Sequence, residues 1–244
     1  MHDPAAFPTP AELERAAAAA WRAREVEERD GWLLRFAPRV PHRRSNSALP
    51  LTPDADVSVP ARFYAERGAP VVVAIAPAPD HAGLDESLAA RGWKAEGHTN
   101  VLVAKAANGA PVRDDARHSG RPLPRGVERV DPFAWPHPAV GEDVLPFSRG
   151  EVLAFADGQR GAVLCVRTGE LAGIFRLHVA PQERRQGVGS RLIAACATVA
   201  PLLYAQVEAG NDAAERLFGR AGFARSHAYH YRREPAVPPA VPGT

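Results

Sequence analysis

The hydrophobic pattern of the second half of the chain alternates between strand-like and helix-like runs. After Gly187 the apolar residues recur every three or four positions, at Val188, Leu192, Cys196 and Val199, which is typical of a helix. The elements predicted in chain order are strands at 127–130, 152–156, 162–166 and 174–179, a helix from 188, a strand at 202–208, a helix from Asn211 and a strand at 227–231. The proline-rich segment at 131–150 has little periodicity, so we expect short or irregular helices there.

The first half contains a similar set of elements. Thr9-Pro10 with Glu12 is a typical helix start, because Thr caps the helix, Pro occupies its first position and Glu closes the capping box. That helix is predicted to run to about Arg24. The other elements predicted are strands at 31–36, 45–51, 71–75 and 99–103 and helices at 61–66 and 84–90.

The two halves repeat one another at an offset of 130 residues. Gly92-Trp93 matches Gly222-Phe223 at this offset, and the strand at 71–75 matches residues 201–205. A repeat of this kind favours a duplicated fold. We therefore predict a unit at 1–107, a linker rich in Gly, Pro and charge at 108–124, a second unit at 125–234 and a disordered tail at 235–244.

Composition narrows the classes of function. The net charge is only +2, and the 30 basic residues, all arginine except Lys94 and Lys105, are scattered, so no nucleic-acid partner is predicted. No basic leader follows Met1, and the alanine run at 16–20 is too short to span a membrane. We expect a cytoplasmic protein with no membrane partner, either a monomer or a homodimer.

The cysteine and histidine patterns indicate no metal site. Cys165 and Cys196 each lie in an apolar run, so we expect two buried, reduced thiols. The nine histidines form no His-x-x-x-His or His-Cys cluster, so no metal is predicted.

The turn at 184–190, Arg-Arg-Gln-Gly-Val-Gly-Ser, has the chemistry of an anion site. It leads from a strand into a helix, whose first N–H groups have no intrahelical partner and whose dipole favours negative charge. Gly187 and Gly189 let the backbone approach a phosphate, and Arg184 and Arg185 add positive charge. The turn is neither a P-loop nor a dinucleotide fingerprint, and an ordinary turn before a helix is the alternative. We expect glutamate at 187 or 189 to abolish anion binding without unfolding the protein.

Several motifs together resemble the GNAT superfamily of acetyl-CoA-dependent N-acetyltransferases. The resemblance covers residues 151–233 and rests on Leu177-x-Val179-x-Pro181, Arg184-x-x-Gly187-x-Gly189, Val207-x-x-x-Asn211 and Ala214-x-x-Leu217-Phe218-x-x-x-Gly222-Phe223. It implies an α/β (α+β) fold class with tandem GNAT folds, each a central mixed, mostly antiparallel sheet flanked by helices. It also implies acetyl-CoA as co-substrate.

The first half resembles the degenerate N-terminal copy of two-domain bacterial GNAT proteins. This resemblance rests on the sequences at 31–35 and 43–47, and a convergent small α/β domain is the alternative. No Arg-x-x-Gly-x-Gly occurs between Leu51 and Val71, so we expect one coenzyme A site per chain.

The resemblance implies cofactor contacts from three places. The backbone of the strand before the loop meets pantetheine, and an N–H there polarises the thioester carbonyl. The loop amides hold the pyrophosphate, and Asn211 bonds the pantetheine arm, caps a helix, or both. The full expected set is Leu177, His178, Val179, Arg184, Arg185, Gln186, Gly187, Val188, Gly189, Ser190, Asn211 and Phe218.

The family's usual proton-handling residues are missing. Phe218 stands where many members have an acidic Tyr, and the usual carboxylate positions fall near Gly173 and at Gln206. The candidate base is Glu208, which shares a strand face with Gln206; a solvated strand-end carboxylate is the alternative. Tyr229 and Tyr231 are candidates for the acid, with packing as the alternative. His178 is a further candidate base, although strand alternation points it away from the cofactor, and Tyr204 is expected to pack.

These features support two functions. The first is N-acetyl transfer to a primary amine of a small molecule or amino acid. The second is an acetyl-CoA-binding module with little catalysis. The acceptor would lie between the two halves and the segment at 131–150, where Asn46, Glu142 and Asp143 are candidate contacts.

Overall fold

The computed structural model of the chain describes residues 7–77, 81–106, 122–134 and 138–235. The predicted linker at 108–124 lies outside the described residues except for its last three positions. The predicted tail at 235–244 lies outside them except for Pro235.

The first half contains the predicted elements and one further strand. Its helices are α1 (Pro10–Ala20), α2 (Ser58–Ala65) and α3 (Ala82–Ala90), and its strands are β1 (Glu25–Arg29), β2 (Trp32–Phe36), β3 (Ala48–Pro50), β4 (Val72–Ile75) and β5 (Lys94–Lys105). The capping box of α1 is confirmed, because the Glu12 N–H donates to Thr9 Oγ1 at 3.3 Å and the Thr9 N–H donates to the Glu12 carboxylate at 2.7 Å. The helix ends at Ala20, before the predicted Arg24.

The second half follows the predicted order. Its strands are β6 (Glu128–Val130), β7 (Glu151–Ala156), β8 (Gly161–Thr168), β9 (Leu171–Val179), β10 (Leu202–Glu208) and β11 (Ala224–Arg233), and its longer helices are α5 (Val188–Cys196) and α6 (Asp212–Arg220). The described part of the segment at 131–150 holds short helices, as expected: 3-10 turns at Pro132–Ala134 and Leu145–Phe147, with α4 (Pro138–Asp143) between them. No helix among the described residues is long and apolar enough to cross a membrane.

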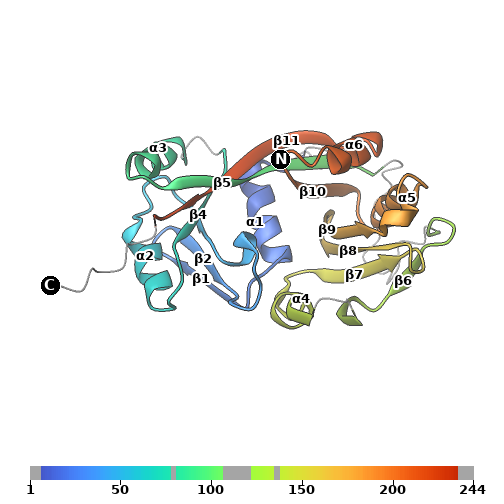
Figure 1. The fold of residues 1–244 in the computed structure, drawn as a ribbon, viewed down its shortest axis with the longest axis horizontal. Coiled ribbons are helices and arrows are strands. Elements are labelled where there is room, and N and C mark those ends of the chain that lie inside the picture. The colour runs from blue at the N-terminus through green and yellow to red at the C-terminus, as the bar shows by residue number, and fades with distance from the viewer. Residues whose placement is uncertain (1–6, 78–80, 107–121, 135–137, 236–244) are drawn as a thin grey trace.

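Eleven strands form one continuous sheet in the order β1-β2-β3-β4-β11-β5-β10-β9-β8-β7-β6. The last strand of each half inserts into the other half: β11 pairs with β4, and β5 pairs with β10, while β5 and β11 pair with each other. Figure 1 shows these two long strands side by side, linking the halves. All neighbours are antiparallel except β3–β4 and β9–β10. The predicted fold class is confirmed, with the strands of both halves joined in one sheet.

The repeat offset of 130 residues also separates elements of the structure. It relates α3 (Ala82–Ala90) to α6 (Asp212–Arg220), and it relates the starts of β4 and β5 to those of β10 and β11. Gly92 and Gly222, which follow the two helices, have φ of +80° and +85°, a left-handed conformation that favours glycine. The division into units at 1–107 and 125–234 stays a prediction, and the exchanged strands cross it.

Helices cover both faces of the sheet. On one face α1 packs near Phe175, Tyr204 and Tyr229; on the other, α5 and α6 cover β8 to β10. Along β10, Leu203, Ala205 and Val207 belong to the α5–α6 layer, whereas Tyr204 belongs to the α1 layer. Gln206 therefore faces α1 and donates to Glu14 of that helix at 3.5 Å.

Candidate functional site

The parallel strands β9 and β10 separate part-way along their length. They pair from Leu171–Leu202 to Ile174–Ala205, and no pairing between them is recorded beyond that point, although β9 continues to Val179 and β10 to Glu208. On its other side β9 has an irregularity opposite Ala162 and Leu164. Arg176 at this place has φ +54°, so an extra residue bends the strand as in a β-bulge. The bend and the separated ends leave free backbone groups facing the opening.

The loop after β9 leads into α5 as predicted. Gly187 is the N-cap residue with φ +78°, and no side chain caps the helix, so its first N–H groups remain available to an anion. Gly187 is exposed, whereas Gly189 is buried and a Cβ there would lie 2.9 Å from Leu217 Cδ2 of α6. A Cβ at 189 therefore requires the half-buried Leu217 side chain to shift, and the expectation that a glutamate there leaves folding intact stays a prediction.

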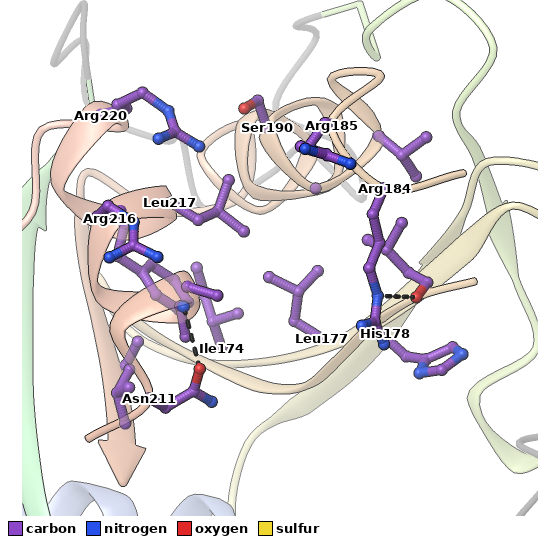
Figure 2. Close-up of a pocket in the computed structure, with 18 of the residues that line it drawn as sticks. Ile174, Leu177, His178, Arg184, Arg185, Ser190, Asn211, Arg216, Leu217 and Arg220 are labelled. Atoms are coloured by element: carbon purple, nitrogen blue, oxygen red, sulfur yellow. Dashed lines mark hydrogen bonds between the residues drawn. The ribbon is translucent and has the colours of Figure 1, made fainter. Parts of the chain in front are cut away.

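A cavity of about 1080 Å³ extends from this loop to the opening between β9 and β10. Figure 2 shows Leu177 pointing into it from β9, Leu217, Arg216 and Arg220 reaching it from α6, and Arg184 and Arg185 at the loop. Apolar side chains thus line its middle, and arginines surround the end near the helix. This distribution suits an extended molecule with an apolar arm and a phosphate-bearing end.

Almost all of the expected cofactor residues line this one cavity: Leu177, His178, Val179, Arg184, Arg185, Gly187, Val188, Gly189, Ser190, Asn211 and Phe218. Gln186 is the exception and does not line the cavity. Its side chain donates to the Gln182 carbonyl, and its backbone carbonyl accepts from Arg191. The His178 ring points away from the cavity, as strand alternation predicted (Figure 2). Asn211 caps α6, accepting from the Ala214 N–H at 3.1 Å.

A buried carboxylate supports the loop from behind. Asp157, in the turn between β7 and β8, accepts hydrogen bonds from Arg191 at 2.6 and 2.9 Å and also pairs with Arg160. Arg191 in turn donates to the Gln186 carbonyl at 3.2 Å. Burial alone would raise the pKa of Asp157, but the hydrogen bonds and charges of the two arginines outweigh it and lower the pKa. Asp157 therefore stays ionised and ties α5 and the loop to the sheet.

Asp157→Asn is expected to lower the free energy of unfolding by about 1–3 kcal/mol at neutral pH, the cost of leaving buried charged hydrogen bonds incomplete. Since the folded-state pKa is lowered, the stabilisation is present above the unfolded pKa and is lost as pH falls through the folded pKa. Urea unfolding of both proteins from neutral to acidic pH should show the difference shrinking below about pH 4. Asp212→Asn, at an exposed carboxylate 3.8 Å from Arg216, is the control; an equal effect of both changes would contradict this role.

A second cavity of about 260 Å³ lies on the α1 face of the same opening. Arg176, Gln206 and Glu208 line both cavities, so the two are adjacent at the separated strand ends, a place called here the junction. The rest of its wall combines residues of both halves: Trp21, Pro41, His42, Arg43, Arg44, Gly97, Thr99, Phe175, Tyr229 and Tyr231. The structure therefore provides two adjacent compartments whose shared wall contains the Glu208 carboxylate.

The structure brings the three candidate catalytic residues to the small cavity. Glu208 lies at the junction, and Tyr229 and Tyr231 line the α1 side with their rings 5.5 Å apart. Burial, followed by the neighbouring Tyr229, raises the pKa of Tyr231 well above its usual value, so Tyr231 keeps its proton at neutral pH. Tyr204 is buried, as expected from packing, and lines neither cavity.

The structure explains why Gly173 carries no carboxylate. A Cβ at Gly173 would lie 2.5 Å from the Tyr204 ring and 2.6 Å from Phe175, so any side chain at that position collides with two aromatic rings. Tyr204 and Phe175 fill the space that a Glu would need.

The three acceptor contacts expected from the sequence have other partners. Asp143 is buried and is bonded to Arg39 at 2.7 Å and to Arg24 at 3.3 Å, and Glu142 pairs with Arg39 at 2.9 Å. The Asn46 side chain accepts from the Ala37 N–H and donates to the carbonyl of Val40. None of them lines the small cavity. They join the segment at 131–150 to the first half and brace its loop at 37–46.

Sequence reasoning did not select Arg44, Arg176, Arg216 or Arg220. Arg216 and Arg220 are four residues apart on the helix that Asn211 caps, so they share a face with Leu217, and that spacing was the available signal. Arg44 is brought to the site only by the fold. Cys165 and Cys196 are buried and free, as predicted, and the described residues hold no cluster of three metal-ligating side chains.

Comparison with known proteins places this chain in the GNAT superfamily. The model of a family described as "Probable histone acetyltransferase Rv0428c C-terminal" matches residues 11–232, and the chain belongs to that family. A search of curated proteins finds no match.

Solved structures share the fold along most of the chain. A GCN5-related N-acetyltransferase from Kribbella flavida is 15% identical with a TM-score of 0.64, covering 96% of this chain and 99% of that one. A functionally unknown conserved protein from Staphylococcus epidermidis ATCC 12228 is 14% identical with a TM-score of 0.57, covering 89% and 96%. A GCN5-related N-acetyltransferase from Sphaerobacter thermophilus is 16% identical with a TM-score of 0.50, covering 94% and 95%.

Proposed function

We propose that the protein transfers an acetyl group from acetyl-CoA to a primary amine of a small molecule or amino acid by direct attack. The observation that carries this proposal is the junction of the two cavities between β9 and β10, with Glu208 at the meeting point. The large cavity has an arginine-rich end for the phosphates of coenzyme A and an apolar middle for its pantetheine arm. The small cavity gives an amine access to the thioester from the opposite face.

Acetyl-CoA would lie with its pyrophosphate at the first turn of α5 and its pantetheine arm along Leu177. The helix dipole and the arginines at 184, 185, 216 and 220 favour the phosphates. The thioester would then reach the bulge at Arg176, where a backbone N–H freed from strand pairing stabilises the oxyanion.

In the proposed reaction Glu208 accepts a proton from the acceptor amine, directly or through water, as its nitrogen attacks the acetyl carbon. The new C–N bond forms, the C–S bond breaks, and the thiolate takes up a proton. Tyr231 or Tyr229 supplies that proton in place of the phenylalanine at 218. Two compartments meeting at a carboxylate suit this sequence of proton transfers.

The first half is not expected to bind coenzyme A. At the N-terminus of α2, the counterpart of the loop helix, the Asp56 carboxylate already accepts from the Ser58 N–H at 2.9 Å and from its hydroxyl at 2.5 Å. A phosphate there would compete with a carboxylate and be repelled by it. Isothermal titration of the full chain with acetyl-CoA should give one site per chain, and two sites of equal affinity would refute the assignment.

A second candidate function is an acetyl-CoA-binding module with little catalysis. Phe218, Gln206 and Gly173, which replace the usual acid and carboxylates, favour it. The family description, which names a histone acetyltransferase, adds a protein lysine as a further acceptor class. Release of the coenzyme A thiol with a panel of amines, amino acids and lysine peptides separates these functions, because a binding module releases none. A cytoplasmic location and a monomeric or homodimeric state remain predictions.

A further inference from the structure

A guanidinium in the wall of the small cavity, that of Arg44, forms no ion pair with a carboxylate of the described residues. Arg44 lies 5.8 Å from the Phe175 ring, and its Nε is buried with no hydrogen-bond partner among the described residues. The Nε of the neighbouring Arg43 also lacks a hydrogen bond, but it lies 3.3 Å from Glu96 and so has an ionic partner. Elsewhere the Arg44 guanidinium is hydrogen-bonded to the Tyr229 side chain, and the Tyr231 hydroxyl and the Glu14 carboxylate act on it through charge alone. A buried donor with no acceptor is costly unless a ligand supplies one.

At the junction of the two cavities, by contrast, a buried hydrogen-bond acceptor lacks a donor. The Gln206 Oε1 is buried and has no hydrogen-bond donor among the described residues, while its Nε2 is turned to Glu14. Glu208 lies on the same strand face, two residues further on. An amine at this point would donate to Gln206 and Glu208, and it would stand where the proposed attack requires it.

Aromatic rings form much of the rest of the cavity wall. Trp21 stacks on Phe175 with ring centroids 5.3 Å apart, and Tyr229 and Tyr231 close the other side. Their surface suits an apolar group of modest size, because the cavity measures about 260 Å³, a volume close to the lower end for small-molecule sites.

We infer that the acceptor is a small α-amino acid with an apolar side chain, its carboxylate on Arg44 and its amine at Gln206 and Glu208. This inference rests on the proposed function and specifies the acceptor. The amine loses a proton to Glu208 and gains the acetyl group, and coenzyme A leaves as the thiol. The carboxylate is unchanged and serves only to hold the substrate.

The test compares ligands that differ by the carboxylate alone. Isothermal titration of the full chain saturated with coenzyme A is carried out with L-leucine against 3-methylbutylamine and L-phenylalanine against 2-phenylethylamine. Each amino acid should bind about ten to a hundred times more tightly than its amine, the range for hydrogen bonds to a charged group. Arg44→Ala should abolish this preference, whereas Arg225→Ala, at an exposed arginine on β11, should keep it.

Equal affinities within both pairs, an unchanged preference in Arg44→Ala, or tighter binding of an end-blocked lysine peptide would overturn the inference. If Arg44→Ala does not fold, the methyl ester of L-leucine in the wild-type protein replaces it, since it masks the carboxylate alone. Thiol release with amines regardless of a carboxylate would refute this inference and leave the acetyltransferase proposal standing. Carboxylate-dependent binding without any thiol release would refute the transferase and leave the carboxylate site.

Discussion

Ser190→Glu is expected to weaken acetyl-CoA binding by about a hundredfold or more, because two unit charges about 4 Å apart repel by about 4 kcal/mol at an effective dielectric of 20. Ser190 is exposed in the first turn of α5 and lines the large cavity, so its new carboxylate would occupy the proposed pyrophosphate position. Folding should be unaffected, since a glutamate in the first turn is favourable to the helix dipole. Gly187 and Gly189 are poorer test positions, because the first has positive φ and the second packs on Leu217.

Isothermal titration with acetyl-CoA measures the effect, with Ser190→Gln as the matched control for size. Glutamine lacks the charge, so its loss should be several times smaller than that of glutamate. If Ser190→Glu is folded by circular dichroism and binds acetyl-CoA as the wild type does, the loop does not hold the pyrophosphate.

Glu208→Gln is expected to lower kcat by about 10²–10⁴-fold at neutral pH, the usual effect of losing a general base. Glutamine preserves the size and shape of the side chain, but it replaces one accepting oxygen with a donating NH2 and cannot accept the amine proton. Coenzyme A affinity should change little, because the phosphate end of the cavity is untouched. The defect should shrink at alkaline pH, where more of the acceptor amine is already neutral.

The comparison for this change is Glu215→Gln, a carboxylate on α6 that bonds Asn100 at 2.6 Å and does not line either cavity. That variant should keep its rate and its pH profile. Wild-type kcat and pH dependence in Glu208→Gln would remove Glu208 as the base and leave water, since the His178 ring points away from the cavity. In the same assay Phe218→Tyr, which restores the family's residue, should raise the rate or leave it unchanged.

The sequence predicted those parts of the fold that depend on local pattern. The apolar period identified α5 and α6, and the repeat offset relates α3 to α6 residue for residue. Strand β1 was missed, because Glu25–Arg29 is a charged, largely solvent-facing edge strand without a hydrophobic run. The exchange of β5 and β11 was not predictable, since strand order depends on pairing between segments more than a hundred residues apart.

The two compartments of the site also differ in how far the sequence predicts them. The cofactor side is built largely from one contiguous stretch, Leu177 to Ser190. The glycines and arginines of this stretch predict an anion site from the sequence alone. The acceptor side draws Trp21, Arg44 and Tyr231 from three distant segments, and only packing of α1 and the exchanged strands brings them together. For that reason the sequence selected Asp143 and Asn46, whose polar groups are already used within the fold.

The most direct test of acetyl transfer in this cleft follows one labelled acetyl group. The full chain is incubated with acetyl-CoA labelled with carbon-13 in the acetyl group and with L-leucine or another amine, and both products are quantified by mass spectrometry. The account predicts labelled N-acetylated amine and free coenzyme A in equal amounts, formed with wild-type protein and lost in Ser190→Glu. Tight binding of acetyl-CoA with no labelled amine from any acceptor would contradict it.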